Sequence, residues 1–188
     1  ILQNPTVIVR INQCGFVGYI ILIILIIGLA LAAYRFNFLY NRQKSLIKEL
    51  DTGKFNQGSP LKEIDDVLKQ KDNLDQDQLE TKIEAILSST GPLYDSSISS
   101  IKLLAAVAPL LGLLGTVVGM IGTFQAITLF GTGDPKLMAG GISQALVTTM
   151  LGLIAAVPLL FMHNQLDTRS REIIQIIEEE AIGKIASK

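Results

Sequence analysis

Threonine hydroxyls are the side chains most able to do chemistry within the apolar part of this sequence. Thr116 lies in the run APLLGLLGTVVGMIGTF, and Thr149 lies in the run GISQALVTTMLGLIAAVP. A hydroxyl in an apolar segment can bond to water or to a polar side chain of a partner, without the cost of burying a charge. The two threonines are therefore candidates to line an internal polar path.

Both threonines belong to faces of small residues, because steps of three and four residues return to the same side of a helix. The two faces are Ala105, Pro109, Gly112, Thr116, Gly119 and Thr123 in the first run, and Ile142, Ala145, Thr149, Gly152 and Ala156 in the second. Small residues also let helix backbones approach closely in lipid, and Gly115 to Gly119 forms a GxxxG motif. Helix packing is therefore an equally good interpretation of these faces.

Several neighbouring residues are secondary candidates for the pore or for packing. They are Thr123, Gln144, Thr148, Pro109, Pro158, Gly112 and Gly119. Each proline frees a backbone carbonyl that only a neighbouring helix or water can satisfy. His163 follows the second run, where an interfacial or packing role is the better interpretation than a proton relay. Neither run contains an Asp, Glu, Lys or Arg, so an acid for proton transfer would have to come from another subunit.

The elements that position these residues are long apolar segments. Three blocks lack Asp, Glu, Lys and Arg: Ile11 to Tyr34, Leu103 to Gly133 and Leu137 to Met162. About 20 apolar residues cross the hydrocarbon core, so each block is long enough to span it. The mean hydropathy of the chain is +0.44, and 188 residues could not cover three such helices with polar surface. We expect an all-α integral membrane fold with three transmembrane helices and cytoplasmic helical extensions.

Basic residues predict the orientation of these helices. Arg35, Arg42, Lys44 and Lys48 follow the first block, whereas only Arg10 precedes it. The more basic side faces the cytoplasm, so we expect the N-terminus outside and the C-terminus inside. The expected transmembrane helices are residues 16–36, 102–130 and 138–163. The expected periplasmic parts are the segment 1–15, which suits an interfacial helix, and the turn 131–137. The expected cytoplasmic parts are the helical loop 37–101 and the helical tail 164–188.

Amphipathic spacing predicts helices in the two cytoplasmic parts. In the loop, the apolar positions are Leu61, Ile64 and Leu68, then Leu79, Ile83, Ile86 and Leu87. The expected breaks are Gly53, Gly58 to Pro60, and Gly91 to Pro92. In the tail, Leu166, Ile173, Ile177 and Ile185 fall on one face. We expect the third span to continue into this tail as one long helix.

Composition excludes several classes of protein. The chain has 16 basic and 17 acidic residues and a formal net charge of −1, with no cluster of basic and aromatic residues, so no nucleic-acid partner is expected. Cys14 stands alone, which leaves neither a disulfide framework nor a zinc site, and no metal or cofactor is expected. The first residue is Ile1 rather than methionine, so we expect a removed signal or an N-terminal extension.

The runs GLLGTVVGMIGTF and GISQALVTTMLGLIAAVPLLFMHN resemble the signature of the MotA/TolQ/ExbB proton-channel family, most closely its ExbB and TolQ branch. The resemblance extends over residues 101–165. It implies a non-enzymatic subunit of the bacterial inner membrane that forms a homo-oligomeric ring, a pentamer, around a single-span partner. That partner, ExbD or TolR, carries the proton on an intramembrane aspartate, and the proton-motive force is passed to TonB for transport across the outer membrane, or to TolA.

Carried onto this sequence, the resemblance makes Thr116 and Thr149 pore-facing threonines that bond the partner's aspartate. Gln144 departs from the family, since ExbB and TolQ usually have a glutamate in the GIAEAL segment. An amide does not exchange protons at ordinary pH, so only a hydrogen-bonding role is expected there. The alternatives are a TolQ-like role in envelope integrity and a scaffold that uses its glycine faces only for oligomerisation. A flagellar stator like MotA fits less well, because that branch has four spans.

Overall fold

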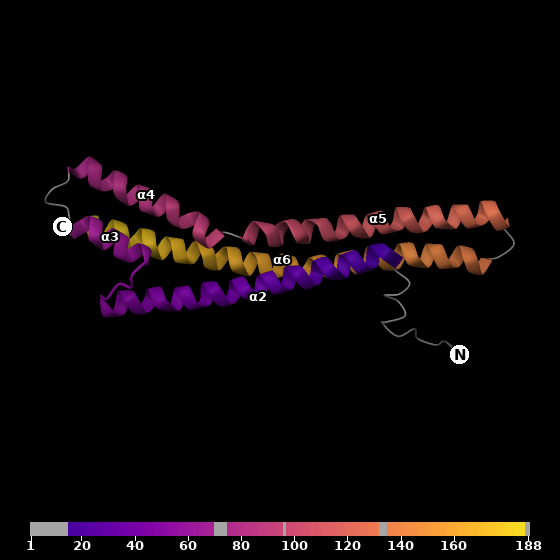
Figure 1. Ribbon diagram of the computed structural model, residues 1–188, viewed down its shortest axis with the longest axis horizontal. Coiled ribbons are helices and arrows are strands. Elements are labelled where there is room, and N and C mark those ends of the chain that lie inside the picture. Colours follow the sequence, from indigo (N-terminus) through magenta and orange to yellow (C-terminus); the bar gives the residue numbers. More distant parts are fainter. Residues whose placement is uncertain (1–14, 70–74, 96, 132–134, 187–188) are drawn as a thin grey trace. The chain divides into compact units, whose positions relative to one another are not determined.

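A computed structural model describes residues 15–69, 75–95, 97–131 and 135–186, which fold into helices (Figure 1). The helices in chain order are α2 (Gly15–Thr52), α3 (Pro60–Lys69), α4 (Gln76–Asp95), α5 (Ile98–Phe130) and α6 (Pro135–Ala186). Within the described residues, α2, α5 and α6 contain stretches long and apolar enough to cross a membrane. The expected all-α fold with three membrane-crossing helices is confirmed at this level. Most of the N-terminal segment 1–15, including Cys14, lies outside the described residues.

The chain divides into two compact units. The apolar unit contains α2 up to Ala32 together with Ser100–His163, and the polar unit contains Ala33–Ser99 together with the chain from Asn164 onward. Helices α2 and α6 each contribute residues to both units and continue without a break past these boundaries. The first apolar block thus belongs to a helix of 38 residues, and the third to a helix of 52 residues.

The core of the apolar unit consists mainly of small and β-branched side chains. Val17 and Ile21 of α2 pack with Ala108 of α5 and with Ala155 and Ala156 of α6. Large apolar side chains on α5 and α6 face outward instead, among them Leu110, Phe124, Leu146 and Phe161. An apolar outer surface around a core of small residues is typical of helices that pack together in lipid.

The polar unit buries the apolar stripes expected of the loop and the tail. Leu61, Ile64 and Leu68 of α3 are buried, as are Leu79 and Ile83 of α4, and these two helices pack together. On α6, Leu166, Ile173 and Ile177 are fully buried, whereas the side chain of Ile185 lies outside the described residues. Ile86 and Leu87 of α4, which were also expected on this face, are only partly buried. The predicted helical faces are confirmed for the other described side chains.

Glycine ends α2 as predicted. Gly53 adopts a left-handed φ of +64° and donates its N–H to the carbonyl of Glu49 at 2.9 Å. Glycine adopts this conformation without the steric cost of a Cβ atom, which makes it the usual residue just past a helix. A second left-handed glycine, Gly58 with φ +81°, lies two residues before α3 begins. Both expected breaks in this part of the loop are confirmed.

The predicted break at Gly91 and Pro92 is wrong. Pro92 lies inside α4, which continues to Asp95, and Ser97 has a left-handed φ of +68°. A proline one turn from the end of a helix removes one backbone hydrogen bond, so its cost is small where other groups hold the last turn.

Arg35 of α2 holds that last turn of α4. Its side chain is 7% exposed, and its guanidinium donates to the carbonyl oxygens of Leu93 at 3.0 Å and Tyr94 at 3.5 Å. The last carbonyls of a helix lack partners within the helix, and a cation complements the helix dipole there. Ser170 of α6 donates to the carboxylate of Asp95 at 2.7 Å. Side chains of α2 and α6 therefore stabilise the end of α4.

Replacing Arg35 with methionine is expected to lower the free energy of unfolding by about 1.5 to 3 kcal/mol, because the partly buried carbonyl of Leu93 and the buried carbonyl of Tyr94 lose a charged donor. Thermal unfolding of the detergent-solubilised protein measures the change. Arg171→Met is the control, since Arg171 is 77% exposed and pairs with Asp167 one helical turn away. This control should change stability by less than about 0.5 kcal/mol. Equal losses in the two variants would contradict the role given to Arg35.

Candidate pore-lining site

Glycines bring the backbones of α5 and α6 into contact. A Cβ atom at Gly152 would lie 2.7 Å from the carbonyl oxygen of Ala108 and 3.0 Å from Cα of Gly112. A Cβ atom at Gly119 would lie 2.9 Å from the carbonyl oxygen of Gly141. These neighbours are main-chain atoms, so a larger residue fits only if the helices separate. Gly112 and Gly119 thus take part in helix packing within this unit.

Two of the candidate threonines are buried inside the α5–α6 contact. Thr148 is 0% exposed, and its hydroxyl donates to the carbonyl oxygens of Gln144 at 3.0 Å and Ala145 at 2.9 Å. Thr123 is 4% exposed, and its hydroxyl donates to the carbonyl oxygen of Gly119 at 3.0 Å. Both hydroxyls are satisfied by their own helices, which is a common arrangement for threonine in a helix.

The two leading candidates, Thr116 and Thr149, are only partly buried. The Thr149 hydroxyl donates to the carbonyl oxygen of Gly112 on α5 at 3.2 Å, and to that of Ala145 at 3.4 Å. The Thr116 hydroxyl donates to the carbonyl oxygen of Leu113 at 2.6 Å. In an α-helix the Gly112 carbonyl also accepts the N–H of Thr116, four residues later. The two threonines are thus linked through the Gly112 oxygen, an acceptor that sequence reasoning missed.

The remaining candidates lie along the same helices. Pro109 and Pro158 are partly buried, and α5 and α6 continue past them. His163 lies at the end of the apolar unit, where its Nδ1 atom is buried and has no hydrogen-bond partner among the described residues. No hydrogen bond joins His163 to Thr116 or Thr149 within the described chain, so it is not part of the same cluster.

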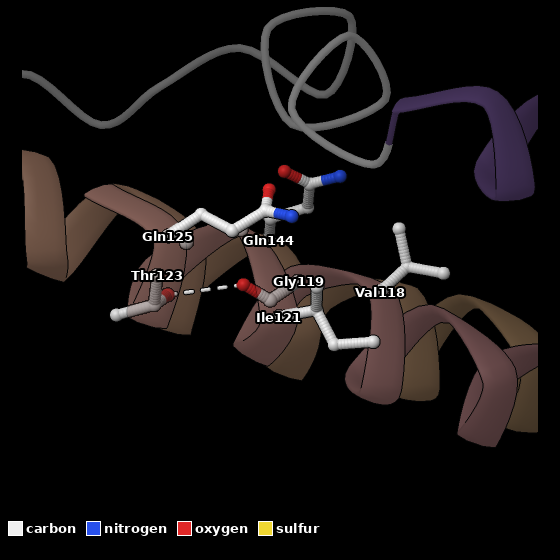
Figure 2. A pocket seen from close by; sticks show the side chains of 8 residues that line it. Val118, Gly119, Ile121, Thr123, Gln125 and Gln144 are labelled. Atoms are coloured by element: carbon white, nitrogen blue, oxygen red, sulfur yellow. Dashed lines mark hydrogen bonds between the residues drawn. The ribbon is translucent and has the colours of Figure 1, made fainter. Parts of the chain in front are cut away.

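A pocket lined by apolar residues, glycines and three polar side chains adjoins the contact between α5 and α6 (Figure 2). Its volume is about 560 Å³, and Gln125 of α5 and Gln144 of α6 both line it, together with Thr123. Figure 2 shows the two amide side chains extending in the same direction from neighbouring helices. Sequence reasoning singled out Gln144 but missed Gln125. The signal was present, since Gln125 is an amide within a block that contains no charged residue.

The described part of the apolar unit contains hydroxyls and amides but no carboxylate. No group of three or more His, Cys, Asp and Glu residues that could hold a metal ion occurs among the described residues. A hydroxyl or an amide can hydrogen-bond a proton carrier, but neither titrates near neutral pH. The described helices of this unit therefore contain groups that can hydrogen-bond a proton carrier but no acid.

Three apolar helices, two of them joined by small-residue faces, define a multi-pass membrane protein. Residues 58–179 match the model of the MotA/TolQ/ExbB proton channel family. This match covers well over half of the chain, and the chain belongs to that family. Its members are channel proteins rather than enzymes.

Similar proteins come from both the ExbB and the TolQ branches. The chain is 32% identical over 83 residues to the biopolymer transport protein ExbB of Pseudomonas putida, covering 44% of this chain and 25% of the relative. It is 34% identical over 91 residues to the Tol-Pal system protein TolQ of Haemophilus influenzae, covering 43% and 40%. It is 40% identical over 81 residues to a Methanothermobacter thermautotrophicus protein named as an ExbB homolog, covering 43% and 28%. The chain thus spans less than half of the length of these relatives.

Proposed function

We propose that this chain is the proton-conducting subunit of an inner-membrane complex that couples the proton-motive force to transport across the outer membrane. The observation that carries the proposal is the family match over residues 58–179, which includes most of α5 and α6. In the proposed complex the N-terminus lies outside and the C-terminus in the cytoplasm. The basic residues after the first apolar block, Arg35, Arg42, Lys44 and Lys48, support this orientation.

The proposed complex requires a partner that supplies an acid. The described apolar unit holds no carboxylate, and a proton crossing a membrane needs a group that can bind and release it. We assign this role to a single-span subunit like ExbD or TolR with one intramembrane aspartate. Copies of the present chain form the surrounding ring, a pentamer by resemblance. The energy of the proton-motive force is passed to a protein like TonB.

Thr116 and Thr149 are the proposed pore-lining residues. The Thr149 hydroxyl donates at 3.2 Å to the Gly112 carbonyl, and the same carbonyl is the helical acceptor for the N–H of Thr116. If the Thr149 hydroxyl rotates away to a new partner, the Gly112 carbonyl still accepts the N–H of Thr116. The rotation therefore leaves no buried acceptor unpaired. The Thr149 hydroxyl is therefore able to donate to an aspartate of the partner.

Proton uptake by vesicles tests the proposal. The chain is reconstituted with the proposed single-span partner, and internal pH is followed with a fluorescent dye after a potential is applied. Uptake is expected in the complete complex and expected to be lost when the partner's intramembrane aspartate is replaced by asparagine, which cannot release a proton. Equal uptake with and without that carboxylate would contradict the proposal.

A TolQ-like role in envelope integrity is the second candidate, favoured by the 34% identity to the Haemophilus influenzae TolQ. The neighbouring reading frames separate the two candidates. A neighbour resembling TonB beside the single-span partner supports the transport role, whereas a neighbour resembling TolA supports the envelope role.

A further inference from the structure

The pocket between α5 and α6 contains two amides that have no hydrogen-bond partner among the described residues. The structure shows no hydrogen bond for the side chains of Gln125 or Gln144 with any other described residue. The third polar side chain, Thr123, is already bonded to the carbonyl of Gly119. The two amides therefore have donors and acceptors available to an occupant of the pocket.

Glycines make room for the Gln144 amide. A Cβ atom at Gly15 would lie 2.7 Å from Nε2 of Gln144, and Gly15 has a left-handed φ of +61° at the start of α2. Gly122, which also lines the pocket, has no atom within 4 Å of the position of its missing Cβ. The pocket is therefore open beside Gly122, and on another side it is bounded by the Gln144 amide, which packs against Gly15.

The chemistry of the lining favours water as the occupant. An amide within an apolar span needs a polar partner, because leaving its donors and acceptors unpaired is unfavourable. Each amide offers both donors and an acceptor, which matches water, and none of the described residues that line the pocket carries a charge that would favour an ion. The volume of about 560 Å³ is far above the roughly 10 to 15 Å³ that one water needs.

The pocket adjoins the level of the pore threonines. Gln144 precedes Thr149 by five residues on α6, which is about 7.5 Å along the helix axis. Val118 also lines the pocket and follows Thr116 by two residues on α5. A hydrated pocket at this position can bring protons close to the threonines without a titrating side chain.

We propose that the pocket between Gln125 and Gln144 is a hydrated, uncharged antechamber that carries protons through water to the level of Thr116 and Thr149. The proposal rests on the proposed function and adds the route by which protons arrive. In this chain the amide pair replaces a titratable group, so the antechamber conducts through the water that the amides hold in place.

Cysteine accessibility tests whether the pocket holds water. In a Cys14→Ser background, Gln125→Cys and Gln144→Cys are compared with Leu153→Cys and Val157→Cys, whose native side chains are exposed on the apolar surface of α6. The full complex in membranes is treated with a charged methanethiosulfonate, which reacts with the thiolate that forms where water reaches. The pocket cysteines are expected to react at least about tenfold faster than the controls, because only they border water.

Proton uptake provides the second measurement. Gln125→Leu and Gln144→Leu are expected to reduce uptake at least about tenfold while the complex still assembles, since leucine removes the groups that hold the water. Slow modification of both pocket cysteines, or full uptake in both leucine variants, would overturn the antechamber. Either result can occur while the wild-type complex still conducts protons. The antechamber proposal can therefore be rejected while the proposed function stands. Absence of uptake in the wild type would instead count against that function.

Discussion

Replacing Gly152 with alanine is expected to lower the free energy of unfolding by about 3 kcal/mol, and so to reduce the amount of assembled protein sharply. The added Cβ atom would lie 2.7 Å from the Ala108 carbonyl oxygen and 3.0 Å from Cα of Gly112. Neither atom can rotate away, so α5 and α6 must move apart and lose contact along their length. Thermal unfolding and size-exclusion chromatography in detergent measure the two effects.

Gly140→Ala on the same helix is the matched control. Among the described residues, no atom beyond its chain neighbours and the nearby backbone of its own helix lies within 4 Å of the position that its Cβ would take. The substitution should leave stability unchanged or raise it by up to about 1 kcal/mol, since alanine favours a helix more than glycine does. A melting temperature for Gly152→Ala equal to that of Gly140→Ala would refute the close contact at Gly152.

Replacing Thr149 with valine is expected to reduce proton uptake at least about tenfold, with little change in stability. Valine keeps the shape of threonine and loses the hydroxyl, which donates to the Gly112 carbonyl at 3.2 Å. A hydrogen bond between membrane helices contributes about 0.6 kcal/mol on average, so the complex should still assemble. Thr116→Val should behave in the same way. Vesicle uptake and unfolding are measured on the same preparations.

Thr168→Val is the control for both threonine variants. The Thr168 hydroxyl donates to the carbonyl oxygen of Asn164 at 3.0 Å on an exposed part of α6 in the polar unit, so its loss removes a hydroxyl outside the apolar unit. Uptake should be unchanged. Undiminished uptake in both Thr116→Val and Thr149→Val would exclude the pore role and favour the scaffold, because a scaffold needs only the shapes of these side chains.

The three membrane-crossing helices could be predicted because each apolar block has no charged residue over the length of a span. The contact between α5 and α6 was also visible in the spacing of small residues, but its register was not. The spacing placed Ile142 and Thr149 on the packing face, whereas Ile142 is 42% exposed and Thr148 is the fully buried threonine. Neighbouring residues differ by about 100° around a helix, and small-residue steps of three and four fit more than one face.

The features that the sequence did not reveal depend on tertiary contacts. The helical turn after Pro92 is held by Arg35, which is 58 residues away from Leu93 in the chain. The pocket combines Gln125 and Gln144 on different helices, with Gly15 on a third helix beside Gln144. Such sites arise from the packing of distant segments, and helical periodicity describes only one segment at a time.

The close approach of α5 and α6 also limits how mutations there can be compensated in a genetic screen. At Gly152 the nearest neighbours are the Ala108 oxygen and Gly112 backbone atoms, so no smaller side chain opposite can restore the fit. A Cβ atom at Gly115 would instead have the Thr148 side chain as its nearest neighbour, with Oγ1 at 2.5 Å. The Cβ atom of Thr148 itself lies 2.6 Å from the same position, so a suppressor of Gly115→Ala at this site is expected to be Thr148→Gly, whereas Gly152→Ala should be recovered only by true reversion.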